Sequence, residues 1–143
     1  LTAAAGWGQS NDVVDRLMGQ ERATLGPTAY LVLTAADLLD QGASPEEAIR
    51  ELRGRPWGFS GASGDETVTL GSLAYLSMKA FGLRGGLLYT VFPGRRYAAR
   101  EFGFRGFIQG STAAGRVLSG REVTHVVGKI IESLGQRTEE VSP

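Results

Sequence analysis

The chain has 143 residues, one histidine and no cysteine, and its 15 Lys and Arg residues balance its 15 Asp and Glu residues. A net charge of zero argues against nucleic acid as the main partner, because domains that bind phosphate backbones usually carry a basic surplus. Without cysteine there is no disulfide framework, no cysteine-based zinc site and no cysteine nucleophile, and a Ser-His-Asp site could use only His125. No apolar stretch approaches the ~18 residues that span a bilayer, so we expect no membrane insertion, and we expect no metal or cofactor.

Residues 1–9 are expected to form a flexible N-terminus. Leu1 to Trp7 contain an Ala-x-Ala pattern typical of the end of a secretory signal, although an ordinary flexible segment would have the same composition. The first interpretation favours an exported protein, in the periplasm or at the cell surface.

Helical patterns dominate residues 10–135, which we expect to form one domain. Apolar residues spaced by one helical turn predict a first helix over about 11–20 and a second from Pro27 to Gln41. Ser44 to Glu47 match a capping box, which predicts a short helix that ends near Arg53. The glycine-rich residues that follow, 54–66, are expected to form a loop.

The second half of the chain continues the helical pattern. Thr69 is expected to cap a fourth helix, and Arg95 to Phe104 are expected to form a fifth, after a segment from Leu87 to Phe92 that could be a helical turn or extended. Ser119 to Glu122 match a second capping box, which begins a last helix that ends before a frayed tail over 136–143. The sequence therefore predicts an all-α domain of about six helices.

Two parts of the chain match each other at a fixed offset, which indicates a repeated unit. At an offset of 50, the fourth helix matches the last, with Thr69, Leu73 and Lys79 corresponding to Ser119, Val123 and Lys129. At an offset of 64, Ala35 in the second helix matches Ala99 in the fifth. We therefore expect two related helix-loop-helix halves around one core.

The segment Tyr97–Gly110 starts with an aromatic residue and Ala and ends in Gly-Phe-Ile-Gln-Gly, and Leu-Ser-Gly-Arg-Glu follows at 118–122. One known family has an aromatic-Ala start, a Gly-Ile-Ile-x-Gly turn and an Ile-Thr-Arg-Ala-Glu helix start in the same order. In this order the two segments resemble an S-layer homology module, over about 97–134 and more weakly over 28–83. The resemblance implies a small all-helical fold of tandem units that binds anionic cell-wall polysaccharide.

The position of that family's binding arginine holds Gly120 in the second half and Leu70 in the first. The segment Phe92–Tyr97 also resembles exported lipoproteins of spirochaetes, a resemblance that implies no particular function.

Basic and aromatic residues are densest near the predicted fifth helix, where Arg95, Arg96, Tyr97, Arg100, Phe104 and Arg105 lie. Arg96 and Arg100 are four residues apart and share a helix face, so their guanidinium groups could together hold a carboxylate, a phosphate or a pyruvylated sugar. Trp57 and Phe59 in the glycine-rich loop could stack on a sugar ring. The alternatives are structural: Arg100 or Arg96 pairs with Glu101 or another acid on a solvated helix face, or Trp57 folds back onto the core.

These residues favour a non-enzymatic cell-envelope binding or scaffolding module that contacts an anionic cell-wall polymer or an envelope protein and could form an oligomer. One alternative is a subunit of a larger envelope assembly, which docks through an apolar patch of Leu87, Leu88, Tyr89, Phe107 and Ile108 and has no small ligand. Another is a helical peptidoglycan hydrolase or lyase with Glu101 as general acid. His125 is expected to be a structural residue, because no second His or Cys could complete a site with it.

Overall fold

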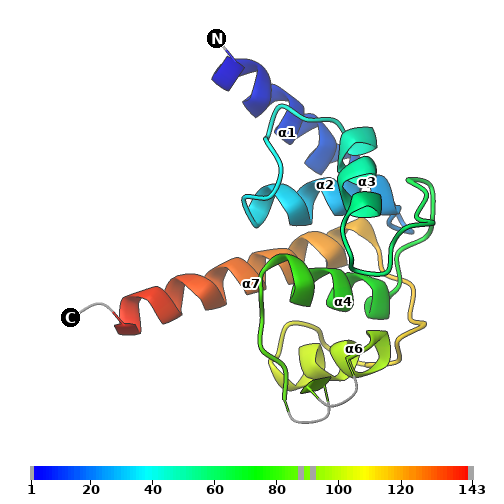
Figure 1. The fold of residues 1–143 in the computed structure, drawn as a ribbon, viewed down its shortest axis with the longest axis vertical. Coiled ribbons are helices and arrows are strands. Elements are labelled where there is room, and N and C mark those ends of the chain that lie inside the picture. The colour runs from blue at the N-terminus through cyan, green and yellow to red at the C-terminus, as the bar shows by residue number, and fades with distance from the viewer. Residues whose placement is uncertain (1, 87–88, 91–92, 142–143) are drawn as a thin grey trace.

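The computed structural model describes residues 2–86, 89–90 and 93–141 (Figure 1). Its helices are α1 (Thr2–Met18), α2 (Leu25–Ala35), α3 (Pro45–Gly54), α4 (Leu70–Ala80), α6 (Arg95–Phe104) and α7 (Gly120–Val141). The described ranges contain no sheet and only two isolated β-bridges, which join Thr24 to Thr67 and Thr69 to Val117. The predicted all-α fold of about six helices is confirmed. No helix in these ranges is both long enough and apolar enough to cross a membrane.

Three helices begin at the predicted capping residues. The Oγ of Ser44 accepts a hydrogen bond from the N–H of Glu47 at 3.1 Å, and the Oγ1 of Thr69 accepts one from the first turn of α4 at 3.2 Å. At α7 the box is complete, since the Oγ of Ser119 accepts from the N–H of Glu122 at 3.1 Å and the Oε1 of Glu122 accepts from the N–H of Ser119 at 3.0 Å. These bonds satisfy N–H groups that a first helical turn leaves without partners.

The ends of the chain are more helical than the sequence predicted. Helix α1 begins at Thr2, so residues 2–9 are helical rather than a flexible N-terminus, and α7 continues to Val141, within the expected tail. The segment from Leu87 to Phe92 lies mostly outside the described residues.

Helix α2 ends earlier than predicted, at Ala35 instead of Gln41. Asp37 adopts a left-handed conformation with φ of 59°, which a helix cannot continue through. The chain after it folds back, and the hydroxyl of the fully buried Tyr30 donates a hydrogen bond to the carbonyl of Gln41. Burial raises the pKa of Tyr30.

The backbone contains three copies of one unit where the sequence indicated two. Ala23, Val68 and Leu118 close a ring of hydrogen bonds: Ala23 N–H donates to the Leu118 carbonyl at 2.9 Å, Val68 to Ala23 at 2.8 Å, and Leu118 to Val68 at 3.2 Å. The helices α2, α4 and α7 each begin two residues after a member of this ring. Helix α2 packs against the outer helix α3, α4 against α6 and α7 against α1, and α1 packs against α2 as well (Figure 1). The fold is therefore a pseudo-threefold arrangement of central and outer helices.

The threefold arrangement confirms the match at an offset of 50 but not the match at an offset of 64. The match between Thr69 and Ser119 relates two central helices, as expected, and α2 is the third member of that set. Ala35 lies on the central helix α2 and Ala99 on the outer helix α6, so these two residues do not correspond in the fold.

Candidate functional site

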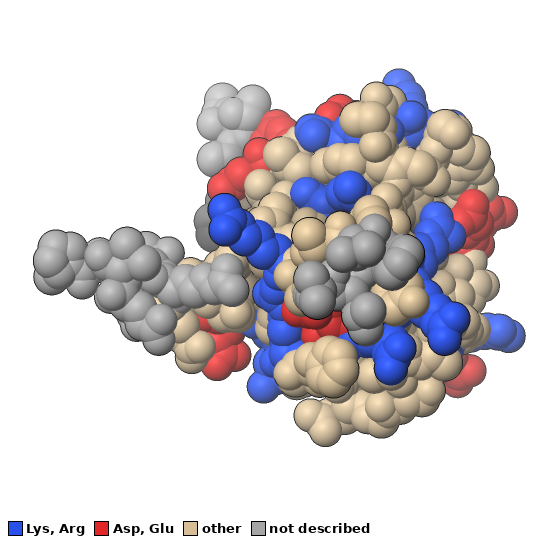
Figure 2. All heavy atoms as spheres, turned by 60° about the horizontal axis from the view of Figure 1, so that its bottom comes forward, with Lys and Arg blue, Asp and Glu red and all other residues tan. Residues whose placement is uncertain are grey.

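Helix α6 places the predicted arginines on the surface. Its buried residues are Ala98, Ala99 and Phe102, which face α4. Arg95, Arg96 and Arg100 lie off this buried stripe and are exposed. Figure 2 brings this end of the molecule forward and shows Lys and Arg side chains distributed around it, with a small acidic group near the middle.

Arg96 and Arg100 line a groove of about 400 Å³ with Thr112, Ala113 and Ala114, here called the Arg100 groove. Within the described part of the chain, no carboxylate forms an ion pair with Arg95, Arg96 or Arg100; the ion pairs there belong to other arginines. Instead the Cζ of Arg95 lies 5.0 Å from the centre of the Phe59 ring, and the Cζ of Arg96 lies 5.9 Å from that of Tyr97. The N–H donors of Arg96 and Arg100 are therefore available to an external anion.

The Arg100 groove continues into a second hollow of about 470 Å³ that also contains Arg100 and Thr112. Phe104, the last residue of α6, lines this hollow and is 80% exposed. Gly103 faces the methyl group of Thr112 so closely that a Cβ would overlap it. Phe104 belongs to the basic and aromatic cluster predicted from the sequence, and its position two residues beyond the buried Phe102 places it on the solvent side of the helix.

Arg105 does not belong to the groove. Its Nε donates to the Oε1 of Glu101 at 3.0 Å, its Nη2 donates to the carbonyl of Arg84, and the Oε2 of Glu101 accepts from the N–H of Gly86 at 3.0 Å. The side chains of Arg105 and Glu101 are only 18% and 16% exposed. The pair fastens the segment before α6 to the helix, so the expectation that Arg105 binds a ligand is corrected. Glu101 was considered as a general acid, and both of its carboxylate oxygens accept hydrogen bonds here, from Arg105 and from Gly86.

The predicted aromatic platform is wrong for Phe59. This side chain is 4% exposed, with its ring centre 6.1 Å from that of Tyr75 and Arg95 over it. Trp57 is half-buried against the core, and the Cζ of Arg55 lies 4.9 Å from its ring centre. The loop therefore folds back onto the domain instead of presenting two free rings.

The predicted apolar docking patch is also absent from the part that can be described. Phe107 and Ile108 are buried, at 5% and 8% exposure, and Tyr89 is half-buried. Leu87 and Leu88 lie outside the described residues. His125 is exposed on α7.

A larger groove of about 670 Å³, which the sequence analysis missed, lies beside α3 and the start of α2. Its charged lining residues are Arg16, Glu46, Arg50, Arg53 and Asp65, and we call it the Arg50 groove. The Oγ of Ser63 hydrogen-bonds to Asp65 and lowers the pKa of that carboxyl group. Because carboxylates accompany its arginines, this groove is less suited to an anion than the Arg100 groove.

The two grooves occupy equivalent places in the repeat. A Cβ added to Gly26 would lie 3.6 Å from the Cβ of Pro45, and one added to Gly71 would lie 3.1 Å from the Cβ of Arg95. Pro45 and Arg95 each begin an outer helix, and the residues five positions later are Arg50 and Arg100. A comparison of α3 with α6 at an offset of 50 would have revealed this second groove from the sequence.

The start of α7 is packed closely against the end of α1. The Cα of Gly120 faces the end of α1 so closely that a Cβ would overlap the carbonyl oxygen of Leu17. Gly120 stands where the S-layer homology pattern has its binding arginine, and a side chain does not fit there without a shift of α1.

Comparisons with known proteins found no matching family model, no matching curated protein and no matching solved structure. Among the described residues, no cluster of three or more His, Cys, Asp or Glu side chains could hold a metal ion.

Proposed function

We propose that this chain is a non-enzymatic cell-envelope module that binds an anionic cell-wall polymer in the Arg100 groove. The observation that carries the proposal is the pair Arg96 and Arg100, which share one groove and have no carboxylate partner among the described residues. Guanidinium groups bind carboxylates and phosphates through paired, charge-assisted hydrogen bonds. Two such groups on one helix face suit a ligand with a charged substituent on each repeating unit.

The shape of the site supports a polymer rather than a small anion. The Arg100 groove and the hollow beside it share Arg100 and Thr112, so they form one track along α6 from Arg96 to Phe104. Phe104 stands in this track with an exposed ring, and aromatic rings pack well on the apolar face of a sugar. An acidic polysaccharide offers both features, a charge for Arg96 and Arg100 and a ring for Phe104.

The proposal is tested by co-sedimentation of the purified protein with isolated cell-wall sacculi at low and at moderate salt. We expect the protein to pellet at low salt and less of it to pellet as salt rises, because screening weakens contacts between exposed charges. The double variant Arg96→Ala, Arg100→Ala should lose pelleting and keep its helical circular dichroism spectrum.

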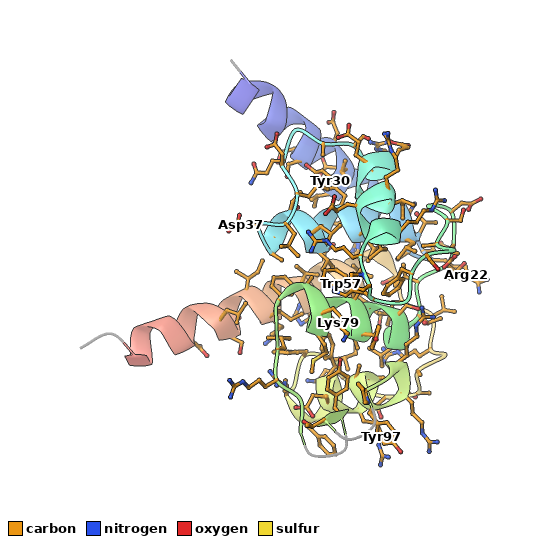
Figure 3. All side chains as sticks on the ribbon, viewed as in Figure 1. Arg22, Tyr30, Asp37, Trp57, Lys79 and Tyr97 are labelled. Carbon is orange, nitrogen blue, oxygen red and sulfur yellow. The ribbon has the colours of Figure 1, made fainter. Side chains whose placement is uncertain are left out.

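A matched control is the double variant Arg22→Ala, Arg121→Ala, which removes the same charge from exposed positions outside both grooves. Arg22 lies far from Tyr97 at the start of α6 (Figure 3). This control should pellet like the unmodified protein. If both double variants lose pelleting equally, net charge and not the groove is responsible; if the unmodified protein stays in the supernatant, the module does not bind the wall polymer.

A further inference from the structure

The Glu101–Arg105 pair on α6 is a clamp for a peptide backbone. The Nη2 of Arg105 donates to the carbonyl of Arg84, and the Oε2 of Glu101 accepts from the N–H of Gly86 at 3.0 Å. The two groups thus grip a non-helical segment by its main chain, at a carbonyl and at the N–H two residues later. The remaining carboxylate oxygen, Oε1, accepts from the Nε of Arg105 and holds the clamp together.

The same pair occurs fifty residues earlier on α3 as Glu51 and Arg55, and there it holds no backbone segment. The Nε and Nη2 of Arg55 both reach the Oε1 of Glu51, at 3.1 Å and 2.9 Å. Among the described residues, nothing donates to the Oε2 of Glu51. The Nη2 of Arg105 therefore donates to a main-chain carbonyl, whereas the equivalent Nη2 of Arg55 contacts Glu51 instead.

Exposure also distinguishes the two copies. The side chains of Arg55 and Glu51 are 29% and 41% exposed, against 18% and 16% for Arg105 and Glu101. The aromatic residue two positions beyond the arginine is buried in one copy, as Phe107, and half-buried in the other, as Trp57. The surface of α3 thus lacks the cover that α6 has.

Among the described residues, no main-chain group hydrogen-bonds to the side chain of Glu51 or Arg55, and the connection that precedes α3 is shorter than the one that precedes α6. Residues 36–44 join α2 to α3, whereas residues 81–94 join α4 to α6 and contain the gripped segment. The shorter connection is also committed elsewhere, since its Gln41 carbonyl accepts the hydroxyl of Tyr30.

From this difference between two copies of one site, we infer that Glu51 and Arg55, with Trp57 beside them, form a docking site for a non-helical, glycine-containing peptide segment of a partner protein. The partner would donate a main-chain N–H to the Oε2 of Glu51 and accept from the Nη2 of Arg55 at the carbonyl two residues earlier. Hydrogen bonds to main-chain groups provide affinity with little sequence preference, and contacts with neighbouring side chains provide specificity. The ring of Trp57 is placed to make such a contact.

The site is separate from the Arg100 groove. Glu51, Arg55 and Trp57 do not line either groove, and Trp57 and Tyr97 lie well apart in the molecule (Figure 3). The docking site and the proposed polymer site can therefore succeed or fail independently.

The experiment uses the full chain, labelled with ¹⁵N, and a synthetic peptide with capped termini that copies Leu83 to Thr90. Trp57 and Trp7 are the two tryptophans of the chain, so the indole N–H of Trp57 reports on the site and that of Trp7 serves as an internal reference. We expect a saturable shift of the Trp57 signal. Glu51→Gln should lower the affinity for the peptide at least about tenfold, because a charge-assisted hydrogen bond is lost. Glu47→Gln, a change at an exposed position of the same helix, should leave the affinity unchanged.

A second peptide, with Gly86→Pro, lacks the N–H that Glu51 is proposed to accept and should not bind. Circular dichroism establishes that each protein variant keeps its helices. The proposal is overturned if the Trp57 signal does not move at millimolar peptide, or if Glu51→Gln or the proline peptide binds as well as its parent.

Discussion

Asp37 and Gly82 take the same left-handed conformation, with φ of 59° and 62°, at equivalent positions after α2 and α4. The N–H of Asp37 bonds to the Thr34 carbonyl at 3.1 Å, and the N–H of Gly82 bonds to the Lys79 carbonyl at 3.4 Å. This conformation is unstrained for glycine, but the Cβ of any other residue approaches its own backbone. Helix α2 therefore ends with a strain that α4 avoids.

Replacement of Asp37 by glycine should relieve this strain. We expect Asp37→Gly to raise the free energy of unfolding by about 0.5 kcal/mol, a net of relieved strain and greater freedom in the unfolded chain. Gly82→Ala should lower it by about 1 kcal/mol. Urea denaturation measures both values, and a less stable Asp37→Gly variant would show that the aspartate side chain stabilises the helix end.

Local signals were enough to predict most of the helices, because their caps are short-range. Ser44, Thr69 and Ser119 each bond within the first turn that they cap, so the pattern of four residues contains the whole interaction. The end of α2 was misplaced because an aspartate holds the left-handed position that usually belongs to glycine.

The copy of the repeat that contains α2 was not detected from the sequence, because its local pattern differs from those of the other two copies. Thr24 makes no side-chain cap to α2, and Pro27 makes the start of α2 unlike those of α4 and α7. The connection from α1 to α2, residues 19–24, is also much shorter than the connection from α3 to α4, residues 55–69. The three copies are related by backbone hydrogen bonds between segments distant in sequence, such as the ring among Ala23, Val68 and Leu118, which no local pattern reveals.

The candidate site was predictable only as far as one helix determines it. The spacing of Arg96 and Arg100 places both on one face, and the structure brings them into one groove. Which arginine pairs with Glu101 was not predictable, because Arg105 is selected by its additional bond to the carbonyl of Arg84, which is distant in sequence. Burial of Phe59 likewise depends on Tyr75, which belongs to the following helix.

Close packing at the start of α7 predicts an unusual sensitivity to a single methyl group. Gly120→Ala should lower the free energy of unfolding by about 1–3 kcal/mol, because the new Cβ would overlap the Leu17 carbonyl and α1 would have to shift. Gly128→Ala on the same helix is the matched control, since nothing lies within 4 Å of its Cβ position. That change should stabilise the protein by about 0.5–1 kcal/mol through helix propensity. Equal effects of the two changes in thermal denaturation would contradict the close contact.

Two phenylalanines of α6 should respond oppositely to truncation. Phe102 is fully buried and its ring centre lies 5.2 Å from that of Phe107, so Phe102→Ala should cost about 3–5 kcal/mol. Phe104 is 80% exposed, and Phe104→Ala should change the free energy of unfolding by less than about 0.5 kcal/mol. In the sacculus assay, however, Phe104→Ala should weaken binding. A large loss of stability in Phe104→Ala would show that the ring packs against other residues of the domain and is not free to contact a ligand.

The carboxyl group of Glu122 should give the folded state a measurable dependence on pH. It accepts the N–H of Ser119 at 3.0 Å and lies 2.6 Å from the Nη2 of Arg116, and the hydrogen bond from Ser119 is the main reason that its pKa is lowered from the usual 4.5. A carboxyl group with a lower pKa in the folded state stabilises the protein above its unfolded pKa, and this contribution is lost as pH falls through the folded pKa. The side chain of Glu122 is 35% exposed, so solvent screening limits the contribution to about 1 kcal/mol.

Glu122→Gln isolates that contribution, because the amide oxygen can still accept from Ser119 but carries no charge for Arg116. The variant should be less stable than the unmodified protein by about 1 kcal/mol near neutral pH, and the difference should shrink as pH falls below about 4.5, where the unmodified carboxyl group becomes neutral as well. Urea denaturation at a series of pH values measures this difference directly. A difference that stays constant down to about pH 2 would mean that the charge of Glu122 contributes nothing and that the shape of the cap alone stabilises α7.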